Sequence, residues 1–152
     1  MIAEARRFLG FDLGTRLTGV AVGENLTGNA RPLATLGMRN AVPDWDAVAQ
    51  LVAQWQPAAL VVGLPLALDG SEQNMSRRAR RFAAELDKRF DCPVHLCDER
   101  HTSQEAARRF AQARSAGSKR RRHAADLDAM AAAVILESWL SLNPANATPR
   151  HD

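Results

Sequence analysis

A continuous apolar run, Ala59–Leu64, constrains the fold of this 152-residue chain more than any other feature. Runs of this kind, bounded here by Pro57 and Pro65, are typical of a strand that is buried on both faces. A doubly buried strand needs neighbouring strands beside it and helices above and below the sheet. The run therefore predicts an α/β protein built around a sheet with a buried centre.

The segments before this run are predicted to form an antiparallel meander. β-type runs at 7–14, 18–23 and 32–36 are separated only by short turns that contain glycine or asparagine. Strands joined so closely pair antiparallel, because a parallel connection needs a dozen or more residues. After Pro43, apolar residues recur at helical spacing until Pro57 ends the pattern.

The segments after the run alternate between helix and strand. The expected elements are a helix that begins at Asp69, a strand at 94–97, a helix opened by a capping box between Thr102 and Glu105, and a last helix over 125–142. Because crossover helices join the later strands, these strands should be parallel.

The expected fold class is a single α/β domain over residues 1–142, followed by a flexible tail at 143–152. Its sheet is mixed and five-stranded, with an antiparallel meander of three strands, two parallel strands, and helices on both faces. In such sheets the ligand site lies where strands end and helices begin. Candidate functional residues are therefore sought at those positions.

Positive charge is concentrated in the middle of the chain. The net charge is +3 overall, but residues 76–123 contain fourteen Lys and Arg against six Asp and Glu, a net charge of +8. A basic segment of this kind indicates a polyanionic partner, although a solvated helix face can also be basic.

The sequence gives no sign of export or of a membrane. The apolar stretch around Ala58–Leu68 contains Gly63 and Pro65 and falls short of the roughly 20 apolar residues of a membrane span, and the N-terminus has no apolar core typical of a signal peptide. Cys92 and Cys97 lie at either end of a predicted strand, where a bridge between them has the wrong geometry. They are expected to be reduced thiols of a cytoplasmic protein.

Acidic residues occur at the expected ends of elements. Asp12 lies in an apolar β-run, and burying a carboxylate there is costly unless a cation or hydrogen bonds compensate it. Its ordinary role would be that of a turn-forming aspartate. Asp98 and Glu99 follow the strand at 94–97, and because adjacent residues of an extended chain point to opposite sides, only one of them can face Asp12.

The last helix contributes a second pair of acids. Asp126 and Asp128 lie about 200° apart around the helix axis, so only one of them can reach the same site. Asp126 is expected to be the N-cap of the helix. Asp128 lies beside the apolar face of the helix, where its ordinary role would be a favourable interaction with the helix dipole.

One acid from each of three elements can converge on one point, and the chemistry that such a set supports is the binding of a hard metal ion. Oxygen ligands favour Mg²⁺ or Mn²⁺, whereas the histidines and cysteines do not have the spacing of a zinc site. Such ions activate water and stabilise the leaving oxygen in phosphodiester hydrolysis. A basic loop containing Lys119 and Arg120 precedes the last helix and is expected to hold phosphate beside the metals.

Four ordered motifs resemble those of a known family. They are Phe11-Asp12-Leu13-Gly14-Thr15-Arg16 with Gly19-Val20-Ala21-Val22, Val62-Gly63-Leu64-Pro65-Leu66 with Asp69-Gly70-Ser71-Glu72-Gln73, Asp98-Glu99-Arg100, and Leu127-Asp128 with the helix that follows. Through them, residues 8–140 are similar to the bacterial YqgF-type proteins, described as nucleases of precursor 16S ribosomal RNA and as Holliday-junction-resolvase-like proteins.

The resemblance implies a ribonuclease-H-like fold, a cytoplasmic location, and a catalytic and metal-binding set of Asp12, Glu99 and Asp128. One acid is thereby chosen from each adjacent pair. The chain departs from the family just before Asp128, where similar sequences more often have a lysine. That charge would then have to come from Lys119 or from the arginines that follow it, which begin with Arg120.

The resemblance also implies which residues meet the substrate. Thr15, Arg16 and Arg100 would line the substrate cleft, together with the Gly63-Leu64-Pro65 loop. The predicted function is that of a metal-dependent nuclease that hydrolyses phosphodiester bonds in processing the 5′ end of precursor 16S ribosomal RNA during ribosome biogenesis. The expected partner is RNA or structured DNA, and the expected state is a monomer or a weak homodimer.

Three alternatives are weighed against this function. A Holliday-junction resolvase needs the same chemistry in a dimer with two sites at a fixed separation. A non-catalytic nucleic-acid-binding module would use the basic segment alone. The Asp-Leu-Gly-Thr sequence at Asp12 also resembles a phosphate motif of actin-like ATPases, but that machinery needs two such domains.

Overall fold

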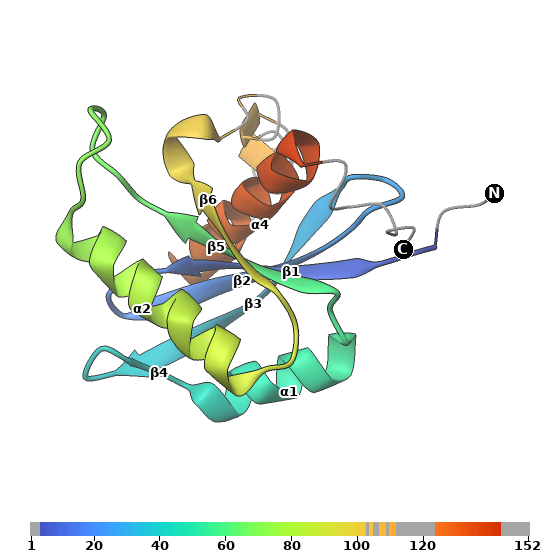
Figure 1. Ribbon diagram of the computed structural model, residues 1–152, viewed down its shortest axis with the longest axis horizontal. Coiled ribbons are helices and arrows are strands. Elements are labelled where there is room, and N and C mark those ends of the chain that lie inside the picture. The colour runs from blue at the N-terminus through green and yellow to red at the C-terminus, as the bar shows by residue number, and fades with distance from the viewer. Residues whose placement is uncertain (1–3, 103, 105–106, 109, 112–123, 144–152) are drawn as a thin grey trace.

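The computed structural model describes residues 4–143 except 103, 105, 106, 109 and 112–123. The helices and strands follow the predicted order with one added strand (Figure 1). They are β1 (Arg7–Leu13), β2 (Leu17–Glu24), β3 (Ala30–Arg39), β4 (Val42–Pro43), α1 (Trp45–Trp55), β5 (Ala59–Leu64), α2 (Asn74–Arg89), β6 (Val94–Asp98), the 3-10 helix η1 (Glu99–His101) and α4 (Ala124–Leu142). The described residues among 104–111 are helical, as expected. The predicted tail lies, apart from Asn143, outside the described residues.

The strands form one mixed sheet in the order β4-β3-β2-β1-β5-β6. β1, β2 and β3 pair antiparallel, and β5 pairs parallel with both β1 and β6. This arrangement confirms the predicted meander and the predicted parallel pairs. The predicted count of five strands is wrong, because the two-residue strand β4 pairs with the end of β3. Asn40 and Ala41 form the turn between them with positive φ, and alanine is not a residue that signals such a turn in a sequence.

Helices cover both faces of the sheet (Figure 1). Successive strand residues point to opposite faces, so Phe8 packs with α4 whereas Leu9 and Phe11 pack with α1 and α2. The predicted central strand β5 is buried along its whole length, and its residues alternate between the two clusters in the same way. We call these sides of the sheet the α4 face and the α1/α2 face.

One predicted helix start and one predicted helix cap are wrong. α2 begins at Asn74 rather than Asp69, because Gln73 and Ser76 form its capping box and Glu72 is instead paired with Arg80 at 2.8 Å. α4 begins at Ala124, which places Asp126 inside the helix and not at its N-cap. In both cases an acidic residue near a helix start suggested a cap, but the chain caps the helix elsewhere or begins it earlier.

Two other predictions concern the cysteines and membrane-spanning segments. Cys92 and Cys97 are both free cysteines, as predicted. Burial raises the pKa of the Cys97 thiol to about 11, with added repulsion from Glu99 and Asp98. Of the helices that the structure describes, none has the length and apolar character needed to cross a membrane.

Candidate functional site

Asp12 lies near the carboxyl end of β1 and points to the α4 face. It alternates with Phe11, which is fully buried on the α1/α2 face, and it pairs with Gly19 of β2. Burial, and to a lesser extent repulsion from Asp128, raises the pKa of Asp12 to about 6. A carboxylate that is buried beside another carboxylate is destabilised in its charged form. The fold therefore holds Asp12 where a cation would stabilise it.

Glu99 reaches the same face from η1, directly after β6. Its Oε2 lies above Gly63 of β5, where a Cβ atom would come within 3.1 Å of it. Phe11 pairs with Val62, so the next residues along these parallel strands, Asp12 and Gly63, are neighbours. Burial raises the pKa of Glu99 to about 7, and repulsion from Asp12 and then Asp98 adds to the shift.

Asp128 reaches the site from the beginning of α4. The helix backbone at Asp128 packs directly on Gly19, and a Cβ atom at Gly19 would overlap the Asp128 carbonyl group. Gly19 is the partner of Asp12 in the β1–β2 pair, so this close approach brings the helix start beside the Asp12 carboxylate. Burial raises the pKa of Asp128.

The structure thus gathers the three predicted acids from three separate elements. Asp12 interacts electrostatically with both Asp128 and Glu99. The three carboxyl groups fit a hard cation, because all of their ligand atoms are oxygens. The pKa of each is raised, so its charged form is unfavourable unless a cation compensates it. Among the described residues, however, no group of three or more His, Cys, Asp or Glu side chains is spaced closely enough to hold a metal ion as it stands.

The alternative acids have other surroundings. Asp98 caps η1 by accepting a hydrogen bond from the Arg100 N–H at 2.9 Å, and its carboxylate also forms an ion pair with the Arg100 guanidinium at 2.7 Å. That pairing gives Asp98 a local structural role. The side chain of Asp126 lies outside what the structure describes.

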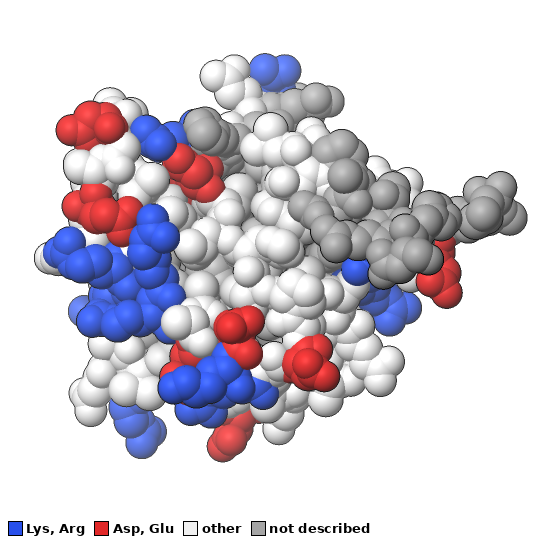
Figure 2. Space-filling view, in the orientation of Figure 1, with Lys and Arg blue, Asp and Glu red and all other residues white. Residues whose placement is uncertain are grey.

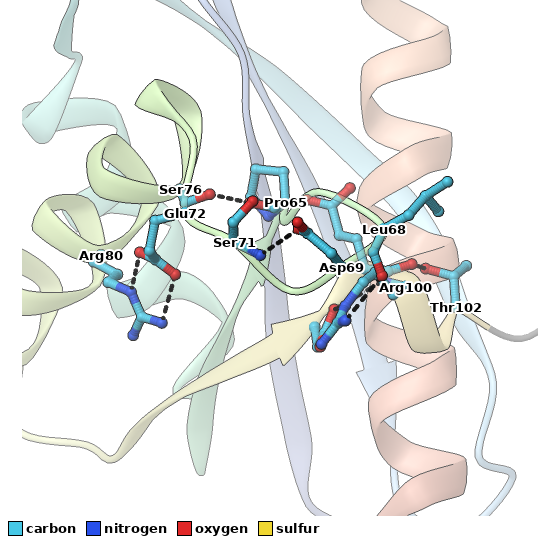
Figure 3. A network of polar contacts seen from close by, with 11 residues as sticks. Pro65, Leu68, Asp69, Ser71, Glu72, Ser76, Arg80, Arg100 and Thr102 are labelled. Atoms are coloured by element: carbon cyan, nitrogen blue, oxygen red, sulfur yellow. Dashed lines mark hydrogen bonds and ion pairs between the residues drawn. The ribbon is translucent and has the colours of Figure 1, made fainter.

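Arg100 is the best defined of the predicted substrate-binding residues, and it braces the loop between β5 and α2 (Figure 3). Besides its pairing with Asp98, its Nη1 donates to the Leu68 carbonyl oxygen at 3.4 Å. At the other end of this loop, the Ser76 hydroxyl donates to the Pro65 carbonyl oxygen. Arg100 therefore shapes the rim of the site, and its side chain is about one third exposed.

Of the four other predicted substrate-binding residues, the structure describes two. Thr15 and Arg16 are exposed in the turn between β1 and β2, next to the end of the strand that carries Asp12. Lys119 and Arg120 lie outside the described residues.

Lys and Arg side chains gather along α2 (Figure 2). Arg80 and Arg89 each form an ion pair with a nearby glutamate. In the described part of the chain Arg81 has no ion pair, and Nη2 of Arg78 is buried without a hydrogen-bond partner. Both arginines line a cavity of about 140 Å³ together with Leu13, the residue after Asp12. These arginines lie with Leu13 on the α1/α2 face, on the other side of the sheet from Asp12.

Sequence reasoning did not recognise the role of Gly19 and Gly63. They flank Asp12 in the two neighbouring strands. A side chain at Gly19 would meet the Asp128 backbone, and one at Gly63 would meet Ile135 and Glu99. A glycine inside a strand often marks a close approach of another chain segment. Two such glycines on either side of a buried acid were the available signal.

A protein-family model described as RuvX, Holliday junction resolvase, matches residues 6–142. The chain belongs to the RuvX family. Curated relatives agree with this assignment: a protein of Azotobacter vinelandii named "Putative pre-16S rRNA nuclease" is 53% identical over 141 residues, covering 92% of this chain and 96% of the relative. A protein of the same name from Pseudomonas putida is 49% identical, covering 93% and 99%. The family resemblance drawn from the four motifs is confirmed.

Solved structures of low sequence identity share the fold. RuvC of T. thermophilus in complex with a Holliday junction substrate superposes with a TM-score of 0.57 at 17% identity, covering 94% of this chain and 98% of that one. The yeast mitochondrial Holliday junction resolvase gives a TM-score of 0.52 at 13% identity, covering 97% and 82%. The RuvX chain therefore has the expected ribonuclease-H-like fold.

Proposed function

We propose that this RuvX-family chain is a divalent-metal-dependent nuclease of the cytoplasm that hydrolyses phosphodiester bonds in precursor 16S ribosomal RNA. The observation that carries the proposal is the gathering of Asp12, Glu99 and Asp128 on one face of the sheet, with the pKa of each carboxyl group raised. Natural folds seldom bury several carboxylates together unless a cation compensates them.

The three carboxylates would hold Mg²⁺ or Mn²⁺, and the bound ions would supply an activated water and charge stabilisation at the leaving oxygen. The chain's own contribution is to position and desolvate the oxygen ligands. β1 fixes Asp12, the start of α4 fixes Asp128, and Glu99 is held over Gly63. Without a cation, Asp12 and Glu99 keep protons up to a pH of about 6 to 7, since each pKa is raised to about that value.

The substrate would approach across basic and polar groups at the same edge of the sheet. Thr15 and Arg16 in the β1–β2 turn are exposed beside Asp12 and can donate to phosphate oxygens. Lys119 and Arg120, in the basic segment that precedes α4 in the sequence, are proposed to contact further phosphates.

Cleavage of ribosomal RNA is favoured over cleavage of DNA junctions by the names of the curated relatives, which are about half identical to this chain over nearly its whole length. Junction resolution is the second candidate, because the family model carries that description and resolvases share the fold. The proposed state of the nuclease is a monomer or a weak homodimer, whereas a resolvase needs a stable dimer to cut two strands.

The decisive experiment is a cleavage assay with Mg²⁺ or Mn²⁺ on a precursor 16S RNA fragment and on a four-way DNA junction. Asp12→Asn, Glu99→Gln and Asp128→Asn should each lower the rate of RNA cleavage by about a hundredfold or more, since each removes a ligand. Asp46→Asn is the matched control, because this exposed acid of α1 is on the other face. If all three variants cut RNA as fast as the parent, the proposed site is wrong.

Cation binding can be tested without catalysis. Mn²⁺ or Mg²⁺ at ten times its dissociation constant should stabilise the parent by about 1.4 kcal/mol, seen as a rise in Tm. Asp12→Asn should remove most of that rise, whereas Asp46→Asn should retain it. An equal rise in both variants would show that the ion binds elsewhere.

A further inference from the structure

A second charged site lies at the opposite end of the sheet from the three carboxylates. A cavity of about 440 Å³ opens there between the start of β1, the end of β2, the start of β3 and the end of α1. Ligand pockets in proteins commonly have volumes of roughly 300 to 1,000 Å³. This cavity is therefore large enough for a small ligand or for one end of a larger one.

Two arginines converge on one tryptophan in this cavity. Arg7 of β1 and Arg31 of β3 flank β2, and their guanidinium carbons lie 5.7 Å and 5.3 Å from the centre of the Trp55 ring. Contacts of this length with an aromatic face hold a guanidinium in place while leaving its N–H groups free to donate. In the described part of the chain, neither guanidinium forms an ion pair or a hydrogen bond.

Polar side chains complete the lining of the cavity. Thr27 and Asn29 line the cavity with further polar groups, and Glu24 is its one acidic lining residue. The site is thus rich in donors and has two positive charges against one negative charge.

This site is separate from the carboxylate site. Arg7 begins β1 and Asp12 comes five residues later, which corresponds to about 17 Å along a strand. Their side chains also point to opposite faces of the sheet, because one position is odd and the other even. A group bound by Arg7 and Arg31 would therefore not occupy the cleft beside Asp12.

We propose that Arg7, Arg31 and Trp55 form a binding site for a phosphate monoester, as found on a free nucleotide or at the 5′ end of an RNA strand. Guanidinium groups match phosphate oxygens in a bidentate manner. A phosphate monoester carries a charge of about −1.5 to −2 at neutral pH, and it is attracted to the net positive charge that the two arginines and Glu24 leave in the cavity. The volume beyond the phosphate would hold the attached sugar.

Two-dimensional ¹H–¹⁵N NMR tests this proposal directly, because the chain has three tryptophans and hence three indole N–H signals. The signal of Trp55 is assigned with Trp55→Phe. Inorganic phosphate, adenosine monophosphate, a 5′-phosphorylated RNA tetramer and the same tetramer with a 5′-hydroxyl are titrated into Asp12→Asn protein, so that the result does not depend on cleavage. The phosphate monoesters should shift the Trp55 signal saturably, and the 5′-hydroxyl tetramer should bind at least about tenfold more weakly.

The matched pair of variants is Arg7→Gln/Arg31→Gln against Arg39→Gln/Lys88→Gln, which lose the same charge from exposed positions. The first should weaken monoester binding by about a hundredfold and the second by less than about twofold. Unchanged signals of Trp45 and Trp139 report that each variant is folded. Tighter binding of the phosphorylated tetramer than of the mononucleotide identifies an RNA end as the ligand, and equal binding identifies a free nucleotide. The proposal is overturned if the Trp55 signal does not respond, if the 5′-hydroxyl tetramer binds equally well, or if both double variants bind alike.

Discussion

The two faces of the sheet accommodate opposite charges by different means. On the α4 face, Asp12 lies between two strands that have glycines beside it, and a helix backbone approaches one of those glycines. On the α1/α2 face, arginines lie over aromatic rings: Arg89 is 4.4 Å from the centre of the Trp45 ring. A guanidinium is attracted to the face of a ring, whereas a carboxylate is not. The acids therefore need space and a cation, and the arginines need only a flat apolar surface.

Strand alternation is what keeps these charges apart. Along β1, Arg7, Leu9 and Phe11 belong to one face, and Phe8, Gly10 and Asp12 to the other. A single strand thus contributes a cation to one site and an anion to another without their meeting. Each site keeps an uncompensated charge, which is the property that a binding site for an ion of opposite sign requires.

The largest expected effect comes from filling the space on the α4 face. Gly19→Ala should destabilise the protein by about 3 kcal/mol or more, because the added Cβ overlaps the backbone at Asp128 and α4 must move as a unit. The free energy of unfolding in urea measures this. Gly37→Ala is the matched control in the next strand, where nothing lies within 4 Å of the added Cβ. A similar loss in both variants would show that close helix packing is not what Gly19 permits.

Removing the charge of Asp12 from the α4 face should stabilise the protein, whereas Gly19→Ala should destabilise it. Since the pKa of Asp12 is raised from 3.8 to about 6, the folded protein keeps its proton while the unfolded chain ionises. The contribution of Asp12 to the free energy of unfolding is therefore most favourable below pH 4 and falls as the pH rises from about 4 to about 6. In EDTA, Asp12→Asn should lose this dependence and gain roughly 1 to 3 kcal/mol over the parent between pH 4 and pH 8.

Urea unfolding of both proteins across this pH range measures the difference. Asp46→Asn, which changes an exposed acid on the other side of the sheet, is the matched control and should not show the gain in stability expected of Asp12→Asn. A constant difference for Asp12→Asn would mean that its carboxylate is not destabilised in the fold.

Much of this fold could be predicted because its signals are local. The apolar run of β5, the short links of the meander and the helical spacing of α2 depend on neighbouring residues, and all three were recognised. β4 was missed because its pairing depends on a turn formed by Asn40 and Ala41, in which alanine adopts a positive φ. The start of α2 was misplaced because Glu72 pairs with Arg80 instead of capping the helix.

The site was less predictable, because its geometry depends on contacts between distant segments. Spacing placed acids at three element ends and left two pairs open, and only the resemblance to a family selected one acid from each pair. That Gly19 admits Asp128 is a contact across more than 100 residues, which no local pattern contains. The arginine site at Trp55 was not anticipated for the same reason: its two cations come from strands that are not adjacent in the sheet.

The smallest expected effect concerns the α1/α2 face, where α1 presents Trp55 to the two arginines. Asp44 caps this helix by accepting a hydrogen bond from the Ala47 N–H at 3.1 Å. Asp44→Ala should lower the free energy of unfolding by about 1 kcal/mol, whereas Asp44→Asn retains the acceptor and should cost much less. Because the cap is at the far end of α1, the Trp55 indole signal should stay in place in both variants. A displaced signal in Asp44→Ala would mean that the arginine site depends on the whole of α1. The acids of the α4 face, in contrast, are held in place by single close contacts.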